Sequence, residues 1–168
     1  MNLGLPKLLS AQFPNIIPVE RPTVNDPVIK NPNWFVGFVD GEGCFSLSVT
    51  KDSAYRLGKI VYWSFSIRQH SRDAKLLQSF VNFLGCGNYF LSKQENACTF
   101  AVKNFEEINV KLIPFFVKHP LRSVKAKDFQ DFGKVVKLIE SKAHLTEQGL
   151  EEIDKIRVGM NSLRIHEE

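Results

Sequence analysis

The chain has 168 residues, of which 43% are hydrophobic and 24% are charged, and its formal net charge at pH 7 is +4. That length suits one well-packed domain and is short for two. No apolar run is long enough to cross a bilayer and no secretory signal layout is visible, so we expect an intracellular protein without a membrane partner. The three cysteines, Cys44, Cys86 and Cys98, form no C-x-x-C pair, which favours free thiols over a zinc site.

The positive charge is concentrated in the middle of the chain. Residues 44–75 and 103–143 are both net basic, whereas residues 144–168 are net acidic. This distribution and a pI near 9.0 favour a polyanionic partner that contacts the middle of the sequence. Charge alone, however, fits an ordinary solvated basic surface as well.

The first 30 residues are predicted to form a proline-rich arm or linker. Six of the eight prolines lie in residues 1–33, and the only helical candidate there is a short stretch around Lys7–Gln12. Proline removes backbone hydrogen-bond donors and stiffens the chain, so this segment is not expected to fold as a domain. We therefore divide the chain into an arm, residues 1–30, and a folded domain, residues 31–168.

From residue 31 onwards the spacing of hydrophobic residues predicts the elements in chain order. Asn31 and Pro32 are typical of a helix start, and apolar residues follow at helical spacing. After Gly43 the period changes to two, which predicts one strand over residues 45–50 and another over residues 60–70. A polar, basic turn joins them, so the two strands form an antiparallel hairpin.

The remaining elements complete an α+β fold. A helix capped by Ser71 is expected to end at Gly85, and a second hairpin then joins residues 88–91 to residues 98–102. Three more helices follow, the first beginning at Asn104. The predicted architecture is a four-stranded antiparallel sheet covered on one face by helices.

Two acids at the end of the first domain helix require a chemical explanation. Asp40 and Glu42 fall where the helix dipole is negative, so unpaired carboxylates there cost stability. A divalent cation removes that cost, because Mg²⁺ prefers carboxylate and carbonyl oxygens. Gly37 and Gly41 are four residues apart on one helix face, where two helices can approach closely. Spacing alone fits equally well a helix that merely ends at Gly41 and Gly43.

Residues 35–43 read F-V-G-F-V-D-G-E-G, which resembles the LAGLIDADG signature of homing endonucleases with Glu as the last acid. The order of hairpin, helix, hairpin and helices is similar to that family too, so the resemblance covers residues 31–161. It implies an αββαββα half-saddle that dimerises through its motif helix. One motif implies a second copy of the chain or a partner half, with Trp34, Gly37, Phe38 and Gly41 at the interface.

The resemblance also implies roles for individual residues. Glu42 and the carbonyl of Gly41 would hold Mg²⁺ or Mn²⁺ at the scissile phosphate, with Ca²⁺ as a non-cleaving substitute. Gln69 would orient the attacking water and Lys125 would stabilise charge near the phosphate, although each is also explicable as an ordinary surface residue. Asp40 is implied to be structural. The implied activity is site-specific, metal-dependent cleavage of both DNA strands, one by each half.

Double-stranded DNA with a long, pseudo-palindromic target is the implied partner. A saddle of antiparallel strands can lie in the major groove, where base edges are distinguishable. The DNA contacts are expected on the polar sheet face and its loops, at Ser46, Ser48, Thr50, Lys51, Tyr55, Arg56, Lys59, Ser64, Ser66, Arg68, His70, Asn88, Phe90, Ser92, Lys93, Gln94 and Thr99. Any amphipathic sheet has a polar face, but this one is basic and nearly free of acids.

Other functions fit the same residues. A protein of this fold that splices introns as a maturase, or binds DNA without cutting it, is the first alternative. The second is a separated or engineered half, because the proline-rich arm resembles the linker before the second motif in two-domain members. An interaction module for an acidic protein is the third, and it leaves the acidic helix end unexplained. Residence in a mitochondrion or chloroplast is implied by the family alone.

Overall fold

The structure, a computed structural model, describes residues 7–16, 26–161 and 164. Its elements, in chain order, are α1 (Lys7–Gln12), α2 (Pro32–Glu42), β1 (Gly43–Lys51), β2 (Lys59–His70), a 3₁₀ turn (Ser71–Asp73), α3 (Ala74–Leu84), β3 (Asn88–Ser92), β4 (Ala97–Val102), α4 (Phe105–Glu107), a π-helical segment (Ile108–Leu112), α5 (Ile113–Lys118), α6 (Lys125–Glu140), a 3₁₀ turn (Ala143–Leu145) and α7 (Glu147–Val158). The predicted α+β class is confirmed. Residues 1–6 and 17–25 of the predicted arm lie outside the described residues, so the boundary at residue 30 stays a prediction.

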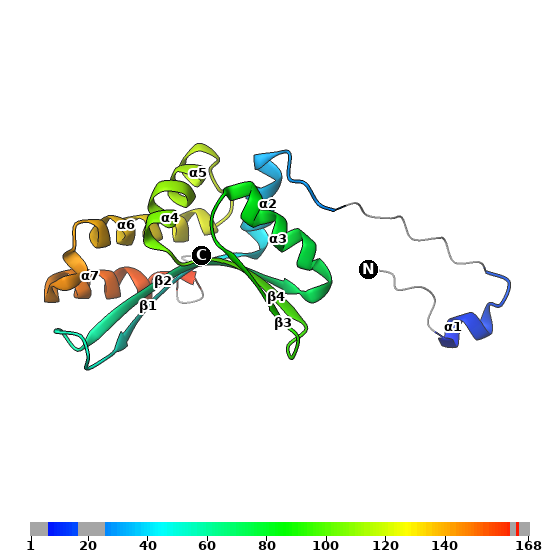
Figure 1. The fold of residues 1–168 in the computed structure, drawn as a ribbon, viewed down its shortest axis with the longest axis horizontal. Helices are drawn as coiled ribbons and strands as arrows, with labels where there is room; N and C mark the ends of the chain where they lie inside the picture. Colours follow the sequence, from blue (N-terminus) through cyan, green and yellow to red (C-terminus); the bar gives the residue numbers. More distant parts are fainter. Residues whose placement is uncertain (1–6, 17–25, 162–163, 165–168) are drawn as a thin grey trace.

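One antiparallel sheet organises the domain. Its strand order is β1-β2-β4-β3, so each predicted hairpin forms and the two hairpins meet along β2 and β4. Figure 1 shows α2 to α7 over one face of this curved sheet and the opposite face free, whereas α1 lies away from the sheet. That free face is the surface on which the sequence predicts DNA contacts.

The core lies between the sheet and the helices and is largely aromatic. Among the described residues, seven phenylalanines are fully buried, including Phe35 of α2, Phe45 of β1 and Phe65 of β2. The Phe45 ring lies 4.9 Å from that of Phe65 and 5.5 Å from that of Phe132 on α6, centroid to centroid. Burying such rings is the largest stabilising contribution available to a domain of this size. It also fixes α2 and α6 against the same end of the sheet.

Two helix starts test the predicted caps. Asn104 is confirmed, because its side-chain oxygen accepts a hydrogen bond from the N–H of Glu107 at 3.1 Å. The predicted cap at Ser71 is wrong. The N–H of Ser71 extends the strand pairing by donating to the carbonyl of Asn96, and the side chain of His70 accepts from the N–H of Arg72. A 3₁₀ turn therefore precedes α3, which has no side-chain cap of its own.

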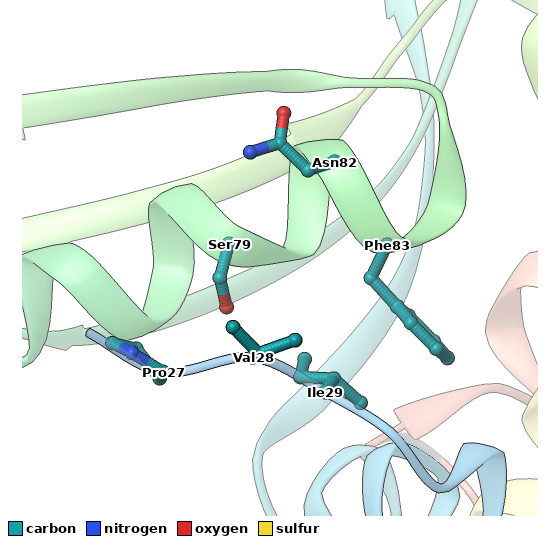
Figure 2. Close-up of a pocket in the computed structure, with 6 residues that line it drawn as sticks. All are labelled: Pro27, Val28, Ile29, Ser79, Asn82 and Phe83. Carbon is teal, nitrogen blue, oxygen red and sulfur yellow. The ribbon is translucent and has the colours of Figure 1, made fainter. Parts of the chain in front are cut away.

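The described end of the arm runs alongside α3. Lys75 of α3 pairs with Asp26 at 2.6 Å, and both side chains are exposed. Figure 2 shows Pro27, Val28 and Ile29 facing α3 across a shallow cavity, whose far wall includes Phe83. In the part of the chain that the structure describes, no helix combines the length and the apolar character needed to span a membrane.

Candidate active site and nucleic-acid interface

The two acids at the end of α2 have different surroundings. Asp40 is half-buried and accepts hydrogen bonds from the N–H groups of Arg122 and Ser123 and from the Ser123 hydroxyl, the last at 2.7 Å. Burial raises the pKa of Asp40, but the Ser123 hydroxyl, the two amides and the charge of Lys125 outweigh it and lower that pKa below its ordinary value. Asp40 thus fastens the loop that precedes α6, which is a structural role.

Glu42, the last residue of α2, is exposed and contacts the end of β2. The side-chain amide of Gln69 donates a hydrogen bond to the Glu42 carboxylate at 2.6 Å. Gln69 is the residue before the end of β2, so the central strand of the sheet brings it to the end of the motif helix. Two of the three predicted catalytic residues are therefore in direct contact.

Lys125 reaches the same junction from α6. It is the first residue of that helix, and its ammonium group donates to the carbonyl of Gly43, the residue after Glu42. Its own N–H donates to the Ser123 hydroxyl oxygen at 3.2 Å, so the loop held by Asp40 also fixes the backbone of Lys125. The structure thus gathers Glu42, Gln69 and Lys125 around the junction of α2 and β1.

The donor set at this junction suits a hard divalent cation. Mg²⁺ is commonly held by one or two carboxylates together with substrate phosphates and water. The exposed carboxylate of Glu42 and the adjacent backbone oxygen of Gly41 are donors of that kind. Within residues 7–16, 26–161 and 164, no group of three or more His, Cys, Asp or Glu side chains is arranged to hold a metal ion.

The strand residues predicted to contact DNA share the free face of the sheet. Residues opposite each other in an antiparallel pair lie on the same face, and the register sets Ser46 opposite Ser64, and Arg68 opposite Thr99. The same parity places on that face further residues predicted to contact DNA: Ser48, Thr50, Ser66, His70, Asn88, Phe90 and Ser92, the last of which was predicted in the turn and lies in β3. Tyr62 also lies there, opposite Ser48 and 55% exposed, and the sequence-based prediction omitted it. Tyr62 could have been predicted, because it lies two residues before Ser64 on the same strand and so on the same face.

Three of the predicted DNA-contacting side chains already have protein partners. Arg68 pairs with Glu95 of the β3–β4 turn at 2.8 Å, and both groups are exposed. Arg56, in the loop between β1 and β2, donates to the carbonyl of Leu145 at 2.7 Å. The Nδ1 atom of His70 accepts the N–H of Arg72. Lys51, Lys59, Lys93, Tyr55 and Gln94 are exposed, and their contacts with DNA stay predictions. Lys51 and Lys59, which were predicted in the turn, instead pair with each other at the ends of β1 and β2, with the parity opposite to that of Ser46 and Ser64.

The outer face of α2 is open. Trp34 is 48% exposed and stacks on the half-buried Phe38, with ring centroids 5.4 Å apart. A Cβ atom added to Gly37 or to Gly41 would meet no atom within 4 Å. The four residues predicted for a dimer interface therefore lie on one accessible strip of α2 that includes two glycines.

Residues 35–136, which include the motif, the sheet and most of α6, match the sequence model of a family described as LAGLIDADG endonuclease. The chain belongs to the LAGLIDADG endonuclease family. Its sequence is also 35% identical over 167 residues to the probable intron-encoded endonuclease 2 of Neurospora crassa, which covers 94% of this chain and 35% of that protein.

Solved LAGLIDADG structures have the same fold. The I-SmaMI LAGLIDADG homing endonuclease bound to cleaved DNA superposes with a TM-score of 0.91 at 36% identity, covering 98% of this chain and 55% of that one. The LAGLIDADG homing endonuclease I-GzeII in complex with its DNA target superposes with a TM-score of 0.86 at 46% identity, again over 98% of this chain and 55% of that one. The predicted half-saddle is confirmed. The chain spans about a third of the curated relative and about half of each solved chain.

Proposed function

We propose that this chain is one half of a site-specific DNA endonuclease that makes a double-strand break by divalent-metal-dependent phosphodiester hydrolysis. The contact between Glu42 and Gln69, with Lys125 at the same junction, is the observation that carries the proposal. These residues come from α2, β2 and α6, and they lie around the junction of α2 and β1. Membership of the LAGLIDADG endonuclease family supports the same activity.

Each residue at the junction has a task in that reaction. Glu42 and the carbonyl of Gly41 would hold Mg²⁺ or Mn²⁺, which when bound lowers the pKa of water and neutralises developing phosphate charge. Gln69 would orient the attacking water, because its amide already lies beside the Glu42 carboxylate. Lys125 would exchange the Gly43 carbonyl for a phosphate oxygen and stabilise its charge.

The free sheet face would bind double-stranded DNA in the major groove. Side chains that alternate along β1, β2 and β4 project from one curved surface, which suits reading of base edges. The DNA-bound I-SmaMI and I-GzeII structures, which share this fold, support the assignment. Lys93, Lys103, Lys118 and Lys127 would contact phosphates, which position the protein without specifying a sequence.

A second LAGLIDADG half would complete the enzyme. The open strip on α2 has the small residues that allow a second helix to approach closely. The chain covers about half of each matched solved structure, which supports pairing with another half, whether a second copy of this chain or a separate partner. A long and pseudo-palindromic target follows from such two-fold pairing. The name of the Neurospora relative, intron-encoded, supports an intron as the origin, and residence in a mitochondrion or chloroplast stays what the family implies.

The solution mass of the purified chain, measured by light scattering with and without Mg²⁺, tests this proposal together with cleavage of a palindromic DNA library. We expect a dimer that selects and cuts particular palindromes, and we expect Glu42→Gln to bind the selected DNA without cutting it. Because Ca²⁺ would substitute without cleavage, binding is measured in Ca²⁺ and cleavage in Mg²⁺. Cleavage by Glu42→Gln at the wild-type rate would overturn the assignment of Glu42.

A further inference from the structure

The first turn of α6 contains a buried carboxylate that the proposed chemistry does not use. Asp128 is 7% exposed, and it is the charged residue that is buried among those the structure describes. It follows Lys125 by three residues, so the two side chains leave the same side of the helix. Burying a charge is costly unless it is paired and hydrogen-bonded. The groups that pair with the Asp128 carboxylate therefore indicate its role in the structure.

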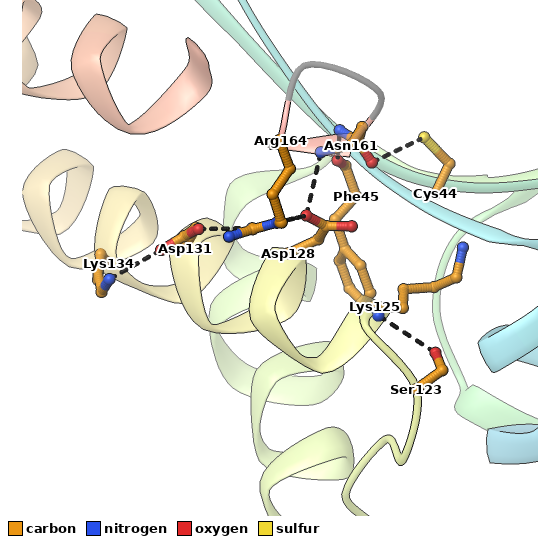
Figure 3. A network of polar contacts seen from close by, with 9 residues as sticks. All are labelled: Cys44, Phe45, Ser123, Lys125, Asp128, Asp131, Lys134, Asn161 and Arg164. Atoms are coloured by element: carbon orange, nitrogen blue, oxygen red, sulfur yellow. Dashed lines mark hydrogen bonds and ion pairs between the residues drawn. The ribbon is translucent and has the colours of Figure 1, made fainter. Parts of the chain in front are cut away.

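The partners come from the chain's C-terminal segment. Arg164 donates to one carboxylate oxygen of Asp128 at 2.8 Å and to Asp131, one turn further along α6, also at 2.8 Å. The N–H of Asn161 donates to that same oxygen of Asp128 at 3.0 Å. Figure 3 shows this network, with Lys134 pairing with the far side of Asp131. Asn161 and Arg164 are thus attached to the first two turns of α6.

Asn161 continues the network to the strand that follows Glu42. Its side-chain amide donates to the carbonyl of Phe45 at 2.9 Å, while its carbonyl oxygen lies 4.0 Å from the Cys44 sulfur. The residue has φ +54°, a left-handed conformation that is unfavourable for most side chains but is tolerated by asparagine. Asn161 thus links Asp128 of α6 to Phe45 of β1. Lys125, also of α6, donates to the carbonyl of Gly43, two residues before Phe45. Together these contacts close a ring around the start of β1, of which Figure 3 shows the side that runs from Asp128 through Asn161 to Phe45 and Cys44.

We propose that Asn161 and Arg164 are positioning residues of the nuclease, a proposal that rests on the function above. The brace they form with Asp128 sets the distance between the start of α6, which carries Lys125, and the start of β1, which follows Glu42. The loop before α6 is held by Asp40 on the opposite side, so Lys125 is fixed from two directions. A displacement of about 1 Å in a catalytic group lowers a rate by up to about a hundredfold, which gives such a brace a catalytic consequence.

Four variants of the full chain separate positioning from simple anchoring of the C-terminal segment. Asn161→Ala removes the side-chain hydrogen bond to Phe45, and Arg164→Gln removes the ion pairs with Asp128 and Asp131. Arg164→Lys keeps the charge but not the two-pronged geometry of the guanidinium. Lys134→Gln is the matched control, because it removes the other cation on Asp131 from an exposed position without touching Asp128.

The first measurement needs neither DNA nor metal. Labelling by a thiol reagent should occur at Cys44, because Cys86 and Cys98 are buried. Arg164 reaches Cys44 through Asn161, so a movement of β1 caused by Arg164→Gln should raise the Cys44 labelling rate at least about threefold, whereas Lys134→Gln should leave it unchanged. An unchanged labelling rate in Arg164→Gln would overturn the brace whether or not the chain is a nuclease.

The second measurement is single-turnover cleavage of the target selected by the wild type, with DNA affinity measured in Ca²⁺. We expect Asn161→Ala and Arg164→Gln to slow cleavage about ten- to a hundredfold while affinity changes less than about twofold, with Arg164→Lys intermediate. Wild-type rates in both variants, or losses that only follow a loss of folded protein or affinity, would reduce the brace to an anchor. If the wild type cuts nothing, the proposed function fails, and Cys44 labelling alone decides whether the brace positions β1.

Discussion

At the junction of α2 and β1, Gly43 has no room for a side chain. A Cβ atom there would lie 2.6 Å from Cγ1 of Val39 and 2.9 Å from the Val39 carbonyl oxygen. The absence of a Cβ lets β1 begin directly beneath the helix that carries Glu42. The carbonyl of Gly43 also accepts a hydrogen bond from the Lys125 ammonium group. Gly43 is therefore needed both for close packing and for the position of a candidate catalytic residue.

We predict that Gly43→Ala lowers the free energy of unfolding by about 1–3 kcal/mol, because an extra methyl group must displace helix backbone. Gly41→Ala, two residues earlier and with nothing within 4 Å of the added Cβ, is the control and should not destabilise the isolated chain. Urea unfolding followed by circular dichroism measures both. Equal stability of Gly43→Ala and the wild type would mean that the junction relaxes more readily than its contacts indicate.

Asp40 should make stability depend on acidity. Its folded-state pKa lies below the ordinary value of 3.8, so it stabilises the fold above that value and ceases to do so as the pH falls through the folded pKa. We predict that Asp40→Asn destabilises the chain by about 1–3 kcal/mol at pH 7 through weakened hydrogen bonds to the Arg122–Ser123 loop. The difference from the wild type should shrink below about pH 4. Thermal unfolding at several pH values measures it, with the exposed Asp154→Asn as control.

At the scale of residues, resemblance to the family motif identified the candidate catalytic residues but not the residues that hold them in place. Glu42, Gln69 and Lys125 were chosen by resemblance, and the structure brings them to one junction. The partners that fix them were not foreseen: Ser123 is 83 residues from Asp40, and Asn161 is 116 residues from Phe45. No periodicity in a sequence marks a single hydrogen bond across such a separation. Only the packing of α6 against β1 brings these residues together.

At the scale of elements, strand parity was the most informative pattern. Alternation with period two placed the ten contacts predicted within the predicted strands on the free face, because a half-buried sheet fixes which side each residue takes. Helix ends were less predictable. Ser71 was assigned to a cap, but strand pairing continues to its N–H, and the 3₁₀ turn that begins at Ser71 is capped by the side chain of His70. A local capping preference is weaker than continuation of an existing sheet.

The pair of Arg68 and Glu95 places an acid at the edge of an otherwise basic face. An exposed ion pair of this kind contributes at most about 1 kcal/mol, so DNA phosphates or bases can compete for Arg68. We predict that Glu95→Gln tightens DNA binding about three- to fivefold near 0.1 M salt by releasing Arg68 and removing a negative charge. Fluorescence anisotropy with a labelled duplex measures it.

Glu106→Gln is the control for that change, because it removes the same charge from an exposed position on α4 and should alter affinity by less than about twofold. Weaker DNA binding by Glu95→Gln would show instead that the acid holds Arg68 in the conformation that DNA requires. Equal tightening by both variants would assign the effect to net charge alone.

At the scale of the whole molecule, the helices cover one face of the sheet and leave two surfaces open. One is the polar sheet face, and the other is the strip of α2 lined by Gly37 and Gly41. The strip reaches Gly41, the residue next to Glu42 at the end of α2. A second half that packs on the strip would therefore extend the sheet face and bring a second set of junction residues beside the first.

Substitution of Gly37 tests that pairing because its effects on the chain and on the assembly should have opposite signs. Glycine inside a helix is less favourable than alanine by about 0.5–1 kcal/mol, and a Cβ on Gly37 meets nothing within the chain, so Gly37→Ala should stabilise the monomer by that amount. On a helix–helix contact the same methyl group would hold the partner away. We therefore expect association, measured by light scattering across a dilution series, to weaken at least about tenfold. Gly133→Ala on α6 is the control, since it also adds a Cβ to open space and should raise stability while leaving association unchanged. If Gly37→Ala associates as the wild type does, the two halves do not meet along this strip.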